Sequence, residues 1–119
     1  CHIEGPDKRG IDCALLYNPA LFRVKNVKLV PYVQELAKDS AFKTRGFLTV
    51  HGEMAGEDVA VIVCHWPSRF SSSFYRESGA RQTKVVKDSL LRVNPGIAHF
   101  NTQRLCLSVS GDNATVIIR

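Results

Sequence analysis

An unbroken apolar run from Val59 to Cys64 leads into the sequence H-W-P-S-R. The run is too short to span a membrane, and its β-branched residues favour a strand over a helix. A short run of this kind is typical of a strand buried on both faces, at the centre of an α/β layered sheet. Pro67 ends the strand, and His65, Ser68 and Arg69 gather at its end. Since ligands of such folds bind at strand ends, we take this end as the functional edge.

Three segments before this run also predict strands. The alternation F-R-V-K-N-V-K-L-V from Phe22 to Val30 predicts a half-exposed strand near a sheet edge. Phe47 to Met54 predicts a strand that forms a β-hairpin with the apolar run, through a turn that contains Gly56. Ile11 to Tyr17 is predicted to be a further strand, which the Asn18-Pro19 turn ends.

After the apolar run the pattern changes to a helical period. From Arg76 to Arg92 it predicts an amphipathic helix that packs on the sheet and ends at N-P-G, residues 94–96. The apolar positions of this helix are Ala80, Val86, Leu90 and Val93. Leu105–Val109 and Thr115–Ile118 predict two strands around an S-G-D-N hairpin turn. Strands on both sides of one helix indicate the α/β (α+β) class, with a mixed β-sheet and helix cover.

Composition limits the possibilities further. The 119 residues fit one domain, and 45% apolar residues is ordinary for a globular protein. The net charge of +5 favours anionic partners, although the Lys and Arg residues are scattered as on an ordinary solvated surface. The cysteines show no C-x-x-C spacing, which argues against a zinc knuckle. No signal peptide or membrane span is visible, and the opening on Cys1 suggests that the chain begins inside a longer protein.

His65 is the sharpest candidate for chemistry. A His, a Ser and an Arg at one strand end can present hydrogen-bond donors and positive charge to one phosphate group. A His at this place commonly has a structural role instead, and both interpretations stay open. Trp66 suits either stacking on a base or sugar or anchoring of the loop.

Three further polar clusters are candidates for ligand binding. Asp7-Lys8-Arg9-Gly10-Ile11-Asp12 places carboxylates and cations around a glycine that allows close approach of a ligand, or it is a charged turn. Thr44-Arg45-Gly46 has the same two interpretations. Asp112 and Asn113 suit a metal ligand beside an amide, although both are also ordinary hairpin-turn residues. No P-loop, G-x-G-x-x-G, H-E-x-x-H or Ser-His-Asp triad is present.

Two motifs occur in the order found in a known family. The chain resembles the endonuclease/exonuclease/phosphatase superfamily over Gly5 to Pro95. The resemblance is carried by three pieces, R-G-I-D-C-A-L-L-Y-N-P-A-L-F, T-R-G-F-L-T-V-H-G-E and G-E-D-V-A-V-I-V-C-H-W-P-S-R, of which the first and the last contain the two motifs. The likeness is greatest to bacterial members with P-D-x-R-G-I-D and N-H-W-P-S-R. It implies part of a four-layer α/β sandwich. It also implies a phosphodiesterase, nuclease or phosphomonoesterase that uses a divalent metal, commonly magnesium.

The resemblance also implies roles for single residues. His65 matches the family residue that contacts the scissile phosphate. Substrate binding is implied for Ser68 and Arg69 of the second motif, and for Asp7, Arg9 and Asp12 of the first.

Several features depart from the family pattern. Cys64 stands where the second motif usually has Asn. The family's Asn and Glu metal ligands would precede Cys1, and its C-terminal Asp-His pair would follow Arg119. The family's G-D-x-N is here G-D-N, so Asp112 and Asn113 are either a shifted remnant, and then metal ligands, or part of an unrelated tail over 97–119.

The sequence therefore predicts one partial domain over residues 1–119. It is expected to be a fragment of a metal-dependent phosphoesterase or nuclease. The expected substrates are phosphate esters, a class that includes nucleic acids. The alternatives are a non-catalytic basic module that binds nucleic acid or another polyanion, and a truncated product without activity.

Overall fold

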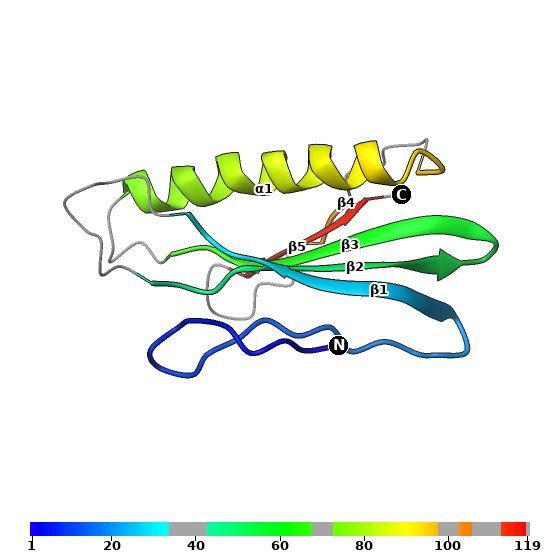
Figure 1. Ribbon diagram of the computed structural model, residues 1–119, viewed down its shortest axis with the longest axis horizontal. Helices are drawn as coiled ribbons and strands as arrows, with labels where there is room; N and C mark the ends of the chain where they lie inside the picture. The colour runs from blue at the N-terminus through cyan, green and yellow to red at the C-terminus, as the bar shows by residue number, and fades with distance from the viewer. Residues whose placement is uncertain (34–42, 68–72, 98–102, 106–112, 119) are drawn as a thin grey trace.

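The computed structural model describes residues 1–33, 43–67 and 73–97, and the backbone of 103–105 and 113–118. Over these ranges the chain forms β1 (Phe22–Val30), β2 (Phe47–Met54), β3 (Glu57–His65), α1 (Ser73–Val93), β4 (Gln103–Leu105) and β5 (Asn113–Ile118). The strands lie in one sheet in the order β1-β2-β3-β5-β4, and α1 crosses one face (Figure 1). This α+β architecture with helix cover confirms the predicted fold class and is consistent with part of a four-layer sandwich.

The strand directions differ from the prediction of a mixed sheet. Over the described strands, every neighbouring pair is antiparallel. β4 runs in the direction of β3, as a strand after a crossover helix does, but β5 lies between them and is antiparallel to both. Most of the predicted strand Leu105–Val109, and the S-G-D part of the turn after it, lie outside the described residues.

β1 is an edge strand, as its half-polar pattern predicts. Its register against β2 shifts between Val24 and Asn26, which marks a β-bulge at Lys25. The extra residue compensates for the irregular spacing of the apolar positions, so that Val24 and Val27 both pack on the face away from α1. On the other face, Lys28 points toward the α1 side.

The predicted hairpin between β2 and β3 is confirmed. Met54 pairs with Glu57 across a two-residue loop of Ala55 and Gly56. The φ angles of these two residues are 53° and 78°, the left-handed values of a type I′ turn. Gly56 adopts this conformation without steric cost, whereas Ala55 is strained by its Cβ.

β3 is buried on both faces, as predicted for the organising strand. The core cluster on the α1 side comprises Phe47, Ala60, Ile62, Cys64, Val86 and Ile97. The cluster on the opposite side comprises Cys13, Phe22, Leu48, Val50, Val59 and Val61. Alternate residues of β3 enter each cluster, so this strand joins the two apolar layers.

The helix lies close to its predicted bounds, and two of its four predicted inward positions, Val86 and Leu90, pack in or against the core cluster on the sheet. Ala80 and Val93 were predicted to pack inward, yet Ala80 is exposed and Val93 is 75% exposed. The buried positions are Tyr75, Ser78, Gly79, Thr83 and Val86. Small side chains at several of these positions let α1 approach the sheet closely, and this fit sets its rotation. Within the described residues, no helix has the length and apolar character needed to cross a membrane.

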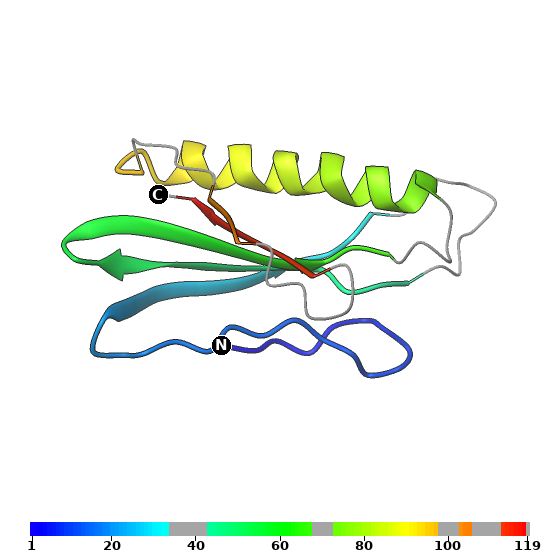
Figure 2. The same cartoon turned by 180° about the vertical axis from the view of Figure 1, so that it is seen from behind.

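The N-terminal segment lies along the face of the sheet opposite α1 (Figures 1 and 2). The predicted strand at Ile11–Tyr17 is wrong, because this segment makes only an isolated bridge between His2 and Ala14. Cys1 and Leu15 exchange backbone hydrogen bonds of 2.9 Å. The segment thus pairs with itself and lays its apolar side chains on the sheet as a third layer.

Candidate functional site

The predicted functional edge is the end of the sheet at which β3 finishes. His65 is the last residue of β3, and its register partner on β5 is Asn113. The sheet therefore brings the backbone of two separate sequence motifs side by side. Ser68, Arg69 and Asp112 lie outside the described residues.

The first motif forms a tight turn that its own carboxylate stabilises. The Gly10 N–H donates to the Asp7 carbonyl oxygen at 3.0 Å, and the Arg9 N–H donates to Asp7 Oδ1 at 2.9 Å. Gly10 has a φ of 68°, in the left-handed region that favours glycine. An Asp followed three residues later by Gly is typical of such turns. The turn fixes the direction in which the Arg9 side chain leaves the backbone.

Asp7 binds two guanidinium groups. Its carboxylate accepts hydrogen bonds from Arg9 Nη2 at 3.2 Å and Nε at 3.3 Å, and from Arg45 Nη1 at 3.4 Å. The side chains of Asp7 and Arg45 are 3% and 5% exposed, whereas that of Arg9 is 65% exposed. The hydrogen bonds from Arg9 lower the pKa of Asp7, against the opposing effect of burial. One buried carboxylate is thus shared by a buried cation and an exposed one.

Arg45 belongs to the Thr44-Arg45-Gly46 cluster, which the sequence left open between ligand binding and a charged turn, and the structure places it buried against Asp7. Burial lowers the pKa of its guanidinium, and the Asp7 charge partly offsets this effect. The group keeps its charge at neutral pH, as arginine side chains in proteins do. Its Nε is buried and has no hydrogen-bond partner within the described residues. The available signal was an Arg placed directly before an apolar strand, but the same pattern is typical of an exposed turn.

Cys13 connects this charged cluster to the end of β3. Burial raises the pKa of its thiol. The Arg45 charge and a hydrogen bond with the His65 backbone lower the pKa, and the Asp12 charge raises it. These influences place all three residues close to Cys13. The thiol itself is buried and neutral, so we assign it a packing role between them.

Asp12 joins two parts of the N-terminal segment through its side chain. Its Oδ1 accepts a hydrogen bond from the Gly5 N–H at 2.9 Å, and its Oδ2 lies 3.1 Å from His2 Nε2. A Cβ on Gly5 would lie 2.9 Å from Asp12 Oδ1, so only glycine permits this approach without a shift. Both carboxylate oxygens therefore hold the segment that carries Asp7 and Arg9.

Two other residues of the second motif contact α1. Trp66 Nε1 donates to Thr83 Oγ1 at 3.0 Å, and a Cβ on Gly79 would come within 3.0 Å of Trp66 Cδ1. This close packing favours the anchoring interpretation of Trp66. Cys64 is buried on the same side, and burial raises the pKa of its thiol to about 11. The position at which the family motif has Asn is therefore a core position here.

The strand end offers positive charge and N–H donors. In the described part of the chain, no group of three His, Cys, Asp or Glu side chains lies close enough together to hold a metal ion. The guanidinium of Arg9 is exposed and His65 is half-buried, so solvent reaches both groups. Planar guanidinium donors suit oxyanions such as phosphate, so the arrangement supports binding of a phosphate group.

The fold and this site define a class of protein, an α+β layered domain that presents cationic donors at the end of a central strand. The family model described as Endonuclease/Exonuclease/phosphatase family matches residues 1–99, and the chain belongs to this family. This match confirms the resemblance carried by the two motifs and places the chain in a phosphoesterase and nuclease superfamily. No curated protein and no solved structure matches the chain.

Proposed function

We propose that this chain supplies the phosphate-binding part of a phosphoesterase that hydrolyses phosphodiester or phosphomonoester bonds. The supporting observation is the sharing of Asp7 by Arg9 and Arg45 beside the end of β3. Two guanidinium charges against one carboxylate leave an excess of one positive charge within this trio. A phosphate oxygen would compensate that charge through charge-assisted hydrogen bonds. Family membership supplies the reaction class.

The residues take different parts in this proposal. Arg9 donates to a phosphate oxygen, since its guanidinium is exposed. His65 stabilises negative charge on the same phosphate. Asp7 and Asp12 act as positioning residues, because their oxygens hold the turn and the segment that carry Arg9. Ser68 and Arg69 are proposed as further phosphate ligands from the motif alone.

Members of the family generally depend on a divalent metal ion, and magnesium is our prediction for the ion. Within the described residues, the side chains do not provide a ligand set for it. Asp112 and Asn113 remain predicted metal ligands. The roles proposed for Arg9 and His65 are those of phosphate ligands, without a metal contact.

Titration with inorganic phosphate tests the binding step. We expect Arg9→Ala to weaken phosphate binding by about tenfold or more, because a hydrogen bond to a charged group contributes roughly 1.5–3 kcal/mol. Arg92→Ala is the charge-matched control, since Arg92 is exposed in the last turn of α1. Chemical shifts of the backbone amides report binding. Equal affinities of Arg9→Ala and the control would contradict the proposal.

Hydrolysis of bis(4-nitrophenyl) phosphate and 4-nitrophenyl phosphate, with and without magnesium, tests the reaction. We expect His65→Ala to lower kcat by about a hundredfold, a typical loss for a group that stabilises transition-state charge. An unchanged kcat would remove His65 from the mechanism. Circular dichroism of each variant shows whether it folds.

Phosphate binding without hydrolysis is the second candidate function. It is favoured by the lack of a metal-ligand set within the described residues. A basic module of this kind would bind nucleic acid or another polyanion with an affinity that falls as salt rises. Magnesium-dependent turnover would exclude it, whereas salt-dependent binding of a short oligonucleotide with no turnover would support it.

A further inference from the structure

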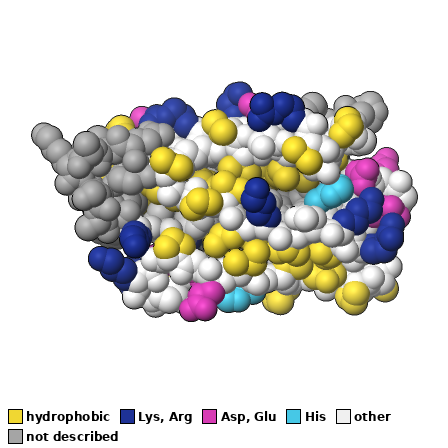
Figure 3. Space-filling model, viewed as in Figure 1, with side chains coloured by type: hydrophobic (Ala, Val, Ile, Leu, Met, Phe, Trp, Pro, Cys, Tyr) yellow, Lys and Arg dark blue, Asp and Glu magenta, His cyan; other side chains and the backbone are white. Residues whose placement is uncertain are grey.

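A groove lies between α1 and the edge of the sheet formed by β1 and β2, away from the phosphate-binding site. Its volume is about 480 Å³, within the usual range of small-molecule sites. Apolar side chains line it, among them Val30, Val86 and Leu90, together with Lys28 and His51. Figure 3 shows apolar side chains along this face, between the helix and the first strand.

The groove forms because α1 packs on β3, in the middle of the sheet, and stands away from β1 and β2. Near its first half the helix is held tightly, where Gly79 meets Trp66. Gln82 of α1 binds the backbone of Val33, which follows β1. The Val33 N–H donates to Gln82 Oε1 at 2.9 Å, and Gln82 Nε2 donates to the Val33 carbonyl oxygen at 2.8 Å. Beyond these contacts, larger side chains separate α1 from β1, and Thr49 forms part of the wall between them.

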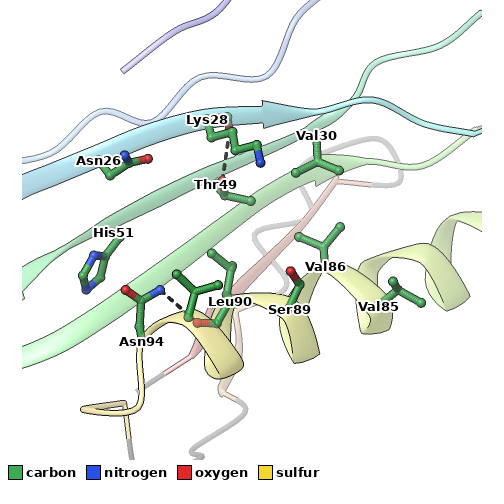
Figure 4. A pocket seen from close by; sticks show the side chains of 11 residues that line it. Asn26, Lys28, Val30, Thr49, His51, Val85, Val86, Ser89, Leu90 and Asn94 are labelled. Atoms are coloured by element: carbon green, nitrogen blue, oxygen red, sulfur yellow. Dashed lines mark hydrogen bonds between the residues drawn. The ribbon is translucent and has the colours of Figure 1, made fainter.

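The polar groups of the groove are unevenly distributed. Figure 4 shows His51 and Asn94 at one end, Val30 and Val86 at the other, and Lys28 reaching from β1 near Thr49. None of the described residues that line the groove is an Asp or a Glu.

Charge complementarity identifies the kind of ligand. Within the described residues, the Lys28 ammonium forms no ion pair with a carboxylate. Lys25, on the same strand, is by contrast held by Asp58 at 2.7 Å. His51 Nε2 lies 3.3 Å from Asp58 Oδ1 and is buried, and among the described residues it makes no hydrogen bond. The groove thus combines apolar walls with a cation that an anionic ligand would neutralise.

From these features we infer that the groove binds an amphipathic anion with a single alkyl chain, such as a straight-chain carboxylate of about eight to ten carbons. The alkyl chain lies against Val30, Val86 and Leu90, and the carboxylate accepts hydrogen bonds from Lys28. This site is separate from the Arg9 and His65 end of the sheet, so it does not depend on the proposed hydrolysis.

Titration with hexanoate, octanoate and decanoate tests this inference. Affinity is expected to rise about fifteenfold for each pair of methylenes, since one buried methylene contributes about fourfold. Decanol provides the uncharged ligand of matched length. Lys28→Gln is expected to remove the preference for decanoate over decanol, and Lys25→Gln is the matched control on β1. Ser89→Phe, which fills the groove, is expected to abolish binding of both ligands.

Amide chemical shifts locate the ligand, and shifts confined to α1, β1 and β2 support the site. Affinity that does not change with chain length, or an unchanged preference in Lys28→Gln, would overturn the inference. So would tighter binding of an acidic amphipathic helix that shifts the amides along the whole of α1, because the face would then be a protein-docking surface.

Discussion

Replacing Asp7 with Ala removes the carboxylate that Arg9 and Arg45 share, and it tests the electrostatics of the site directly. The Asp7 and Arg45 side chains are 3% and 5% exposed, so Arg45 would remain as a buried charge without a partner in the described part of the chain. Breaking a buried ion pair in this way costs about 3–5 kcal/mol. The Arg45 contact is long, at 3.4 Å, so we expect about 3 kcal/mol, the lower end of that range.

The converse substitution, Arg45→Met, is expected to cost much less. It leaves Asp7 with the two hydrogen bonds from the Arg9 guanidinium, at 3.2 and 3.3 Å, and the one from the Arg9 N–H, and it fills the buried space with an apolar chain. We expect about 1 kcal/mol for this change. Once Arg45 is gone, the further loss of Asp7 no longer leaves a buried charge. The double variant is therefore expected to be more stable than Asp7→Ala alone.

Urea unfolding followed by circular dichroism measures these differences. With a slope of about 1.5 kcal/mol per M, a loss of 3 kcal/mol lowers the midpoint by about 2 M. Lys84→Ala is the control, because it breaks the exposed pair with Asp88 and is expected to leave the midpoint unchanged. If Asp7→Ala shifted the midpoint no further than this control, the reasoning about the buried charge would be refuted.

The same variant has a defined pH dependence. The pKa of Asp7 is lowered from its ordinary value of 3.8 by hydrogen bonds from Arg9. Its ionised carboxylate therefore stabilises the fold above pH 3.8, and this contribution is lost as pH falls through the lower folded-state pKa. The stability difference between the native chain and Asp7→Ala should shrink below pH 3.8. A difference that grew on acidification would contradict this assignment.

Three further predictions concern local packing and chemistry. Ala55→Gly should raise the free energy of unfolding by about 1 kcal/mol, measured in urea, because the left-handed φ of 53° no longer strains a Cβ. Gly79→Ala should lower it by about 1–2 kcal/mol, since the new Cβ would lie 3.0 Å from Trp66 Cδ1, and an unchanged stability would show that Trp66 yields freely. In the folded protein, Cys64 should react with iodoacetamide at pH 8 far more slowly than Cys1, because its pKa of about 11 leaves roughly one thiol in a thousand ionised; equal alkylation by mass spectrometry would contradict this.

The central part of the fold could be predicted because each strand carries its own pattern. β1 and β2 were found at their observed bounds, and the Gly56 turn required the hairpin between β2 and β3. The segment Ile11–Tyr17 failed because its composition suits a strand, while its backbone hydrogen bonds go to the neighbouring coil. Apolar content alone does not distinguish a strand within a sheet from an extended layer on top of it.

The buried face of α1 was predicted only in part. The apolar period selected Val86 and Leu90 correctly, but it also selected Ala80 and Val93, whereas the small residues Ser78, Gly79 and Thr83 are buried. Trp66 contributes to this packing, because a Cβ on Gly79 would lie 3.0 Å from its Cδ1, closer than an ordinary contact. That contact joins a residue after β3 to a residue of α1. The hydrophobic pattern of the helix alone therefore cannot predict it.

The candidate site also depends on contacts between distant parts of the chain, which sequence patterns do not show. The resemblance of the first motif to the family gave Asp7 and Arg9, and in the structure one tight turn holds both residues. Arg45 reaches the same carboxylate from another part of the chain, and its burial is not visible in a sequence in which arginine usually marks a surface. A buried arginine needs a compensating carboxylate, and Asp7 is a carboxylate that the N-terminal layer brings down onto the sheet. The N-terminal segment, part of which was wrongly predicted to be a strand, therefore completes this cluster. It lies extended across the sheet and so places the Asp7 turn beside Arg45.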